Sequence, residues 1–103
     1  MATVSKSAAL ARLGDVPEEK RFWCHDGRYL KNLEELGAAL EQMSDETYQY
    51  HSSESKTDFS NWVRDVIGDE KLAKDLLNCT TPAEAAASVA ARVKYLKARA
   101  GVA

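Results

Sequence analysis

The chain has 103 residues, of which 45% are hydrophobic and 29% are charged. A chain of this length holds one core, and this composition is that of an ordinary globular protein, which excludes disorder, collagen and coiled-coil fibres. Its 14 Lys and Arg residues against 16 Asp and Glu residues give a net charge of -2. No apolar run reaches the roughly 20 residues of a membrane helix, and the start lacks the apolar stretch of a secretory signal. We therefore expect a cytoplasmic protein without a membrane partner.

Charge is distributed unevenly along the chain. Residues 32–70 carry ten acids against two bases, whereas residues 85–103 carry four bases and no acidic side chain. Those bases are Arg92, Lys94, Lys97 and Arg99. A helix macrodipole favours cations near its C-terminal end, which explains part of this asymmetry. Most charge runs are solvated faces, and the alternative here is a pair of complementary interaction surfaces.

The first segment is small, polar and irregular, and we expect residues 1–19 to form a loosely ordered arm. Gly14 and Pro17 limit any helix in it to a short turn around residues 8–13. A single helical domain is predicted to follow over residues 20–100.

The domain is predicted to begin with a β-hairpin over residues 20–31. An aromatic strand leads into Asp26-Gly27, which favours a two-residue type I′ turn, and a second short strand returns. A loop of that length fixes the cross-strand pairs, which are Trp23 with Leu30 and Cys24 with Tyr29.

Helical periodicity dominates the rest of the chain. Apolar side chains recur at helical spacing in residues 33–43, 59–67, 70–77 and 82–99, and residues 45–50 favour a short helical turn. Each segment follows a capping residue, which is in turn Asn32, Asp58, Asp69, Thr81 and, for the short turn, Ser44. Trp62 lies at the centre of the widest apolar stripe, so we expect it to be buried. The last helix is predicted to bury Ala86, Val89, Ala90, Val93 and Leu96.

Residues 51–57 are polar throughout and are expected to form an exposed loop. The predicted fold is therefore mainly α: three or four main helices with one N-terminal β-hairpin.

The residues that could carry chemistry are few. Cys24, His25, His51 and Cys79 show no spacing typical of a metal site, so we expect no metal and two reduced, buried cysteines. A cysteine nucleophile served by His51 and Asp58 would need these groups to converge, which spacing alone does not predict. The five glycines occur singly and form no phosphate-binding loop, so no cofactor is expected.

His51 has two interpretations. It either pins the following loop through tertiary hydrogen bonds or serves as a binding or proton-transfer residue, and the absence of an evident partner favours the first. Together with Tyr48 and Tyr50 it would form an aromatic patch suited to a partner, and the same patch could equally be core.

Nucleic-acid binding has weak support in the sequence. The helix after Gly68 is placed like the second helix of a helix-turn-helix, but its acids balance its bases and give it little attraction for phosphate. The basic C-terminal helix lacks the aromatic residues typical of single-strand binders.

A set of short motifs spans residues 22–73: Gly27-x-x-Leu30, Asn32-Leu33-x-x-Leu36, Tyr50-His51, Asp58-Phe59-x-x-Trp62-Val63 and Gly68-Asp69-x-x-Leu72-Ala73. This set resembles an uncharacterised domain-of-unknown-function family of small, largely archaeal prokaryotic domains. The resemblance implies a compact, mainly helical domain found alone or attached to larger proteins. It implies no activity and no catalytic residue.

These observations favour a non-catalytic protein-interaction or regulatory module, acting through a protein partner or self-association. The candidate contact residues are Tyr48, Tyr50, His51, Arg92, Lys94, Lys97 and Arg99. One alternative is a nucleic-acid-binding protein that uses the basic C-terminal helix. The other is a small enzyme that uses Cys24, His51 and Asp58.

Overall fold

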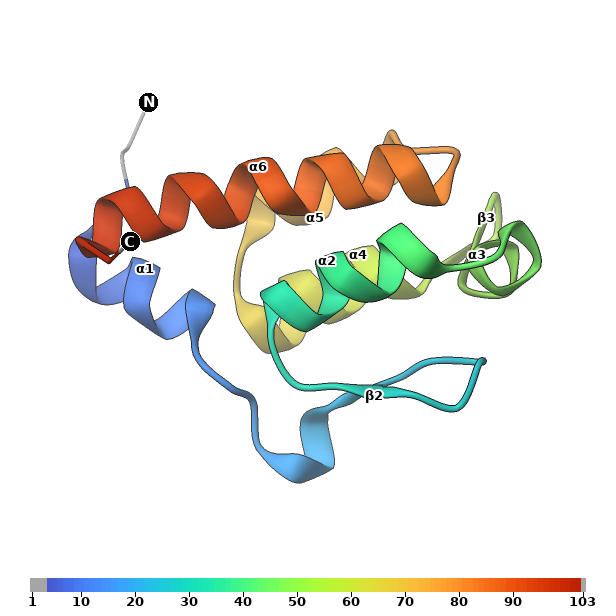
Figure 1. Cartoon of the computed structure of the whole chain (residues 1–103), viewed down its shortest axis with the longest axis horizontal. Helices are drawn as coiled ribbons and strands as arrows, with labels where there is room; N and C mark the ends of the chain where they lie inside the picture. The colour runs from blue at the N-terminus through green and yellow to red at the C-terminus, as the bar shows by residue number, and fades with distance from the viewer. Residues whose placement is uncertain (1–3, 103) are drawn as a thin grey trace.

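The structure, a computed structural model that describes residues 4–102, confirms a small, mainly α-helical domain (Figure 1). The α-helices in that range are α1 (Lys6–Leu13), α2 (Leu33–Gln42), α3 (Asp45–His51), α4 (Asp58–Trp62), α5 (Glu70–Leu77) and α6 (Pro82–Ala100). A 3₁₀ turn, η1 (Glu18–Lys20), and a π-helical turn, η2 (Val63–Ile67), add to them. Strand β1 (Phe22–Trp23) pairs with β2 (Tyr29–Leu30), and β3 (Ser52–Ser53) pairs with β4 (Lys56–Thr57), both antiparallel. In this part of the chain, every helix is too short or too polar to cross a bilayer.

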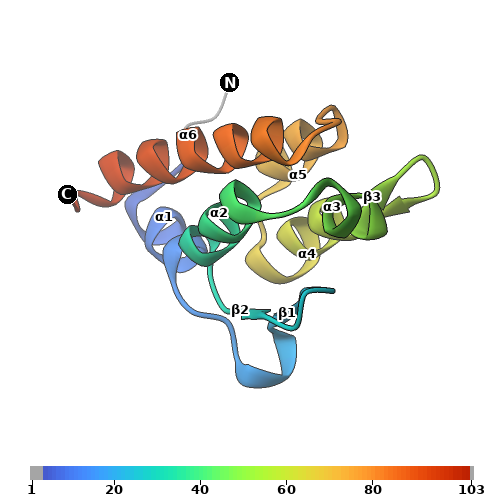
Figure 2. The same ribbon diagram turned by 45° about the vertical axis from the view of Figure 1, so that its right-hand side comes forward.

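Helix α6 runs along most of the length of the molecule, and α1, α2 and α5 pack along it (Figures 1 and 2). Thr81 caps its start as predicted, because the Thr81 hydroxyl accepts a hydrogen bond from the Glu84 N–H at 3.1 Å. It ends at Gly101, whose φ of +76° lies in the left-handed region that glycine adopts without strain. The core therefore lies mainly between α6 and the helices that pack against it.

The buried face of α6 differs in part from the predicted one. Ala85, Ala86, Val89, Leu96 and Ala100 are buried, whereas Ala90 is exposed and Val93 is half-buried. The prediction for Ala90 is wrong because the apolar stripe of α6 is wider than the surface that α1, α2 and α5 cover. The uncovered part lines a groove between α2 and α6.

The predicted arm contains a packed helix. Ser5 caps α1, Ala9 is completely buried, and the helix lies against α6. The carbonyl of Val4 accepts a hydrogen bond from Arg99 Nε at 2.9 Å, 95 residues along the chain. The loosely ordered arm is therefore a wrong prediction for residues 4–13, because the polar sequence gave no sign of the surface that α6 offers to α1. Residues 1–3 of that arm lie outside the described residues.

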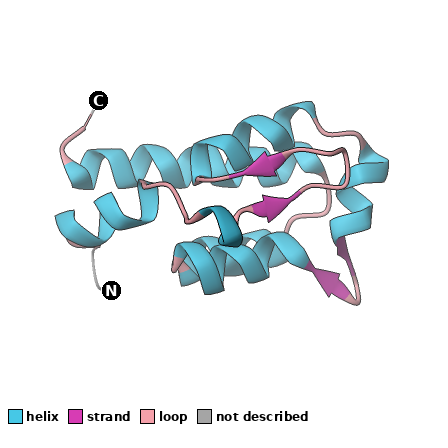
Figure 3. Cartoon of the chain, turned by 90° about the horizontal axis from the view of Figure 1, so that it is seen from below, coloured by secondary structure: helices cyan, strands magenta, loops and turns pink. Residues whose placement is uncertain are grey.

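The first hairpin forms with a different register. Phe22 pairs with Leu30 and Trp23 with Tyr29, so the loop is one residue longer than the predicted turn. Figure 3 shows the two short strands side by side. The Cys24 carbonyl accepts from the Gly27 N–H at 2.8 Å, and Gly27 has a φ of +98°. This geometry is a turn followed by a glycine bulge, which the Asp-Gly pair also permits. The shift places Trp23 and Tyr29 on one face of the hairpin.

In place of the predicted exposed loop over residues 51–57, the chain ends α3 at His51 and forms an ordered hairpin over residues 52–57. His51 belongs to the last turn of α3 and is only 2% exposed, and β3 and β4 pair through Ser53 and Lys56. The prediction assumed that polar residues would be exposed to solvent. It is wrong for His51 because both ring nitrogens find partners inside the domain, as described below.

The segment from α4 to α5 carries the predicted apolar stripe. Trp62 is 7% exposed, which confirms its burial, and its indole Nε1 donates to the Lys20 carbonyl at 2.8 Å. The chain continues as η2, and this helical turn ends at Gly68, whose φ is +87°. Asp69 then caps α5 as predicted, accepting from the Leu72 N–H at 3.0 Å.

Candidate functional site

His51 joins the first hairpin to the start of α4. Its Nε2 accepts a hydrogen bond from the His25 backbone N–H at 2.9 Å, and its Nδ1 lies 2.9 Å from Asp58 Oδ2. Because Nε2 accepts a hydrogen bond, Nδ1 carries the ring proton and donates a hydrogen bond to the Asp58 carboxylate. The ring packs against Phe22 and Phe59, with centroids 5.0 and 5.3 Å away. Both ring nitrogens are therefore engaged in holding three segments together, as the structural interpretation of His51 requires.

The proposed nucleophile does not join this pair. Cys24 is completely buried, and burial raises the pKa of its thiol. Among the described residues, no hydrogen bond links its sulfur to His51, although Asp58 and His51 do meet as the enzyme hypothesis requires. A buried thiol with a raised pKa is a weak nucleophile at neutral pH.

Asp58 also has a different role from the predicted one. It is the first residue of α4, and its carboxylate binds His51 and lies 3.6 Å from Lys56 Nζ. Thr57 therefore occupies the N-cap position of α4, and its side chain makes no capping hydrogen bond. The sequence missed this because a cap is a local pattern, and the His51 contact depends on the fold.

Tyr48 and Tyr50 point in opposite directions. Two residues span about 200° of an α-helix, so the two rings of α3 cannot share a face. Tyr48 is 3% exposed, its hydroxyl donates to the Cys79 carbonyl at 3.3 Å, and burial raises its pKa. Tyr50 is 43% exposed. Of the predicted patch, Tyr48 and His51 belong to the core and only Tyr50 reaches the surface.

A different aromatic cluster lies on the outer side of the first hairpin. Trp23 and Tyr29 are cross-strand neighbours with exposures of 44% and 63%. The Trp23 ring lies 5.9 Å from that of His25 and 6.1 Å from that of Tyr50. We call Trp23, His25, Tyr29 and Tyr50 the aromatic face. The sequence analysis missed it because the predicted register paired Trp23 with Leu30. The Asp26-Gly27 pair was the signal that could have found it, because it also fits a three-residue loop with a glycine bulge.

Tyr50 is held rigidly within this face. The His25 ring stacks on it at 3.9 Å, and Lys56 Nζ lies 3.9 Å from the same centroid. Two groups that close to one centroid occupy opposite sides of the ring, so Tyr50 lies between the loop of the first hairpin and strand β4. The stack and the cation–π contact fix its orientation.

The charged groups beside the aromatic face are paired. Arg28 donates to Asp26 Oδ2 through Nε at 3.0 Å and Nη2 at 2.7 Å, which lowers the pKa of Asp26 to about 2. Lys56 is likewise within ion-pair distance of Asp58. These ion pairs neutralise the charges that lie beside the rings of the aromatic face.

The predicted basic surface of α6 is largely engaged within the chain. Arg92 Nε lies 2.7 Å from the carboxylate of Asp69, which has no exposed surface. Lys97 lies 2.6 Å from Glu34 of α2, and Arg99 binds the Val4 carbonyl. Within residues 4–102, Lys94 is the one of the four bases without an ion pair or side-chain hydrogen bond.

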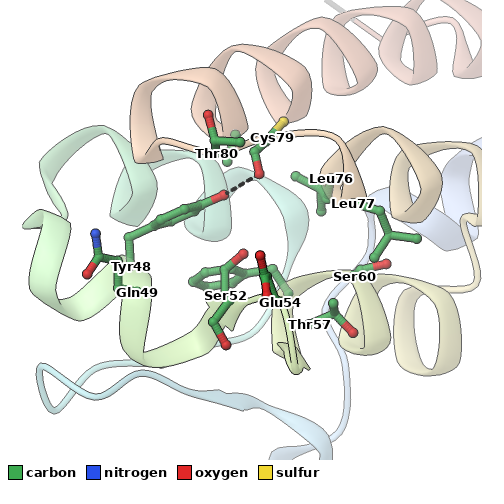
Figure 4. A pocket seen from close by; sticks show the side chains of 13 residues that line it. Tyr48, Gln49, Ser52, Glu54, Thr57, Ser60, Leu76, Leu77, Cys79 and Thr80 are labelled. Atoms are coloured by element: carbon green, nitrogen blue, oxygen red, sulfur yellow. Dashed lines mark hydrogen bonds between the residues drawn. The ribbon is translucent and has the colours of Figure 1, made fainter.

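A pocket of about 570 Å³ lies between α3, the second hairpin, α5 and the start of α6 (Figure 4). Tyr48 closes one side, with its hydroxyl directed to the Cys79 carbonyl. Ser60 and Thr80, which also line it, donate to the Ala73 carbonyl and to Glu84. Its inner polar groups thus already have partners. Among the described residues, no group of three His, Cys, Asp or Glu side chains is placed to hold a metal ion.

Comparison with protein families, curated proteins and solved structures finds no match to this chain.

Proposed function

We propose that this chain is a non-catalytic protein-interaction or regulatory module and that the aromatic face contacts its protein partner. The observation that carries the proposal is the cross-strand pair of Trp23 and Tyr29, two large rings that are both exposed on an otherwise well-packed domain. Tryptophan and tyrosine are enriched at the energetic centres of protein interfaces. A surface that exposes both side by side is typical of a binding site.

The rigidity of the face supports the same proposal. Tyr50 is fixed between His25 and Lys56, and the hairpin loop is tied to His51 in the core. A pre-organised contact surface loses little conformational entropy on binding, which favours affinity.

The two alternatives have less support. Three of the four bases of α6 are engaged with groups of the chain itself, which leaves little positive surface for a nucleic acid. The enzyme hypothesis needs a free nitrogen on His51, and both are engaged.

Partner capture from the native host tests the proposal. The immobilised baits are the wild type, a Trp23→Ser/Tyr29→Ser variant and a Leu10→Ser/Leu77→Ser control, in which two exposed leucines outside the first hairpin are changed. After nuclease treatment, quantitative mass spectrometry should find proteins held by the wild type and the control, and reduced about tenfold or more on the aromatic variant. Equal capture by the aromatic variant would contradict the proposal.

A direct titration completes the test. In a Trp62→Phe background Trp23 is the single tryptophan, so its fluorescence reports contact at the aromatic face. Titrating the recombinant partner should change that emission, with little effect of salt because the neighbouring charges are paired. Micromolar binding of DNA or RNA at physiological salt, lost in Lys94→Glu/Lys97→Glu, would favour the nucleic-acid alternative instead.

A further inference from the structure

The groove between α2 and α6 is a second surface, separate from the aromatic face. Its volume is about 570 Å³, and its lining is mostly apolar. Ala38 of α2 and Ala90 of α6 are exposed in it, and Val102, at one end, is 46% exposed. Small side chains leave the two helix backbones accessible to another helix.

Helices α2 and α6 approach each other closely at Gly37, beneath the groove. A β-carbon at that position would lie 3.2 Å from Val89 Cγ1, a contact that few real side chains make. The Lys97–Glu34 ion pair crosses the groove near the start of α2. Together the two contacts show that α2 and α6 run antiparallel, as Figure 1 also shows.

The two rims of the groove carry opposite charge. Helix α2 contributes Glu34 and Glu41, and α6 contributes Lys94 and Lys97. Glu41 and Lys94 take part in no ion pair within the described residues. A peptide with one sign of charge would be attracted by one rim and repelled by the other.

We propose that this groove is the contact surface of a symmetric homodimer. A two-fold axis along the groove places α2 of each copy opposite α6 of the other, so that each acidic rim faces a basic rim. An axis across the groove would place α2 on α2 and bring acid against acid. The first arrangement also makes all neighbouring helices antiparallel, which is a common packing of four helices.

Two acids of the middle segment, Glu34 and Glu41, thus lie beside two bases of α6, Lys94 and Lys97, on one face of each monomer. In the proposed dimer each rim meets the rim of opposite charge on the second copy. Dimer formation uses a different surface from the aromatic face, so the two proposals can fail separately.

Analytical ultracentrifugation over a wide range of concentrations tests the dimer. The wild type should form dimers as concentration rises, and the dissociation constant should increase with salt because the rims attract through exposed charges. A chain that stays monomeric throughout would overturn the proposal. A Trp23→Ser/Tyr29→Ser variant should dimerise like the wild type.

Two neighbouring alanines of α6 provide a matched pair of variants. Ala90 lines the groove and Ala91 does not, and both are exposed. Ala90→Glu should raise the dimer dissociation constant about tenfold or more, because it places a charge in the centre of the contact. Ala91→Glu should leave it unchanged. Equal effects of the two variants would overturn the assignment of this face.

A charge reversal tests the axis and does not depend on the folding of Ala90→Glu. The axis along the groove places Lys94 of one copy at the level of Glu34 of the other, because Glu34 already contacts Lys97 one turn along α6. Lys94→Glu should therefore weaken the dimer by placing like charges on facing rims, and Lys94→Gln should weaken it less. An unchanged dissociation constant in Lys94→Glu would overturn the arrangement with α2 opposite α6.

Discussion

Replacing His51 with phenylalanine isolates the contribution of its hydrogen bonds to stability. The variant keeps an aromatic ring between Phe22 and Phe59 but leaves the His25 N–H and the Asp58 carboxylate without the His51 partner. A neutral hydrogen bond contributes about 1 kcal/mol, and one to a carboxylate about 1.5 to 3 kcal/mol. Asp58 is 30% exposed and has Lys56 nearby, so the loss of its hydrogen bond from His51 should cost an amount near the lower end of that range. We expect a total destabilisation of about 2 to 3 kcal/mol.

Urea unfolding followed by far-UV circular dichroism measures this change. In a thermal melt the same loss should lower the midpoint by roughly 10 to 20 °C for a domain of this size. His25→Phe is the control, because its exposed ring makes no hydrogen bond that the core requires, and it should cost less than about 1 kcal/mol. The same stability in His51→Phe and the wild type would refute the reasoning that His51 is a structural clamp.

Three further predictions concern the core. Trp62→Ala should lower the free energy of unfolding by about 3 to 5 kcal/mol, measured by urea unfolding, because it removes a buried ring from the centre of the α4 stripe. Asp69→Asn should cost about 3 kcal/mol or more in the same assay, since it leaves a largely buried arginine without its carboxylate, whereas Glu70→Gln at the exposed neighbouring position should cost little. With a thiol reagent at neutral pH, Cys79 should react faster than the buried Cys24, and equal rates would contradict the position of Cys24 in the core.

The elements of this fold could be predicted because their signals are local. Thr81-Pro82 starts α6, Asp69 caps α5 and Gly68 ends the preceding helix, all within a few residues of the structures they determine. Such caps need no knowledge of the rest of the chain. The burial of Trp62 could be predicted for a similar reason, since its helical spacing alone places it at the centre of an apolar stripe.

The candidate site could be predicted only in part. Tyr50 was among the predicted contact residues, but Trp23 and Tyr29 reached the same face only through a hairpin register that the Asp-Gly pair leaves open. A shift of one residue in the register moves side chains to the other face of a hairpin. The register of the folded hairpin, which the sequence left open, therefore decides which rings are exposed.

The sequence by itself determined where α2, α5 and α6 begin and end, which stripes are apolar and which residues are charged. Only the tertiary structure decided how those groups are used: His51 in the core, Arg92 on a buried carboxylate, and Lys97 across the groove to Glu34. The physical reason is the distance along the chain between the residues that interact. A cap or an apolar period is set by residues a few positions apart, whereas a buried polar group depends on a partner that folding brings from a distant part of the chain.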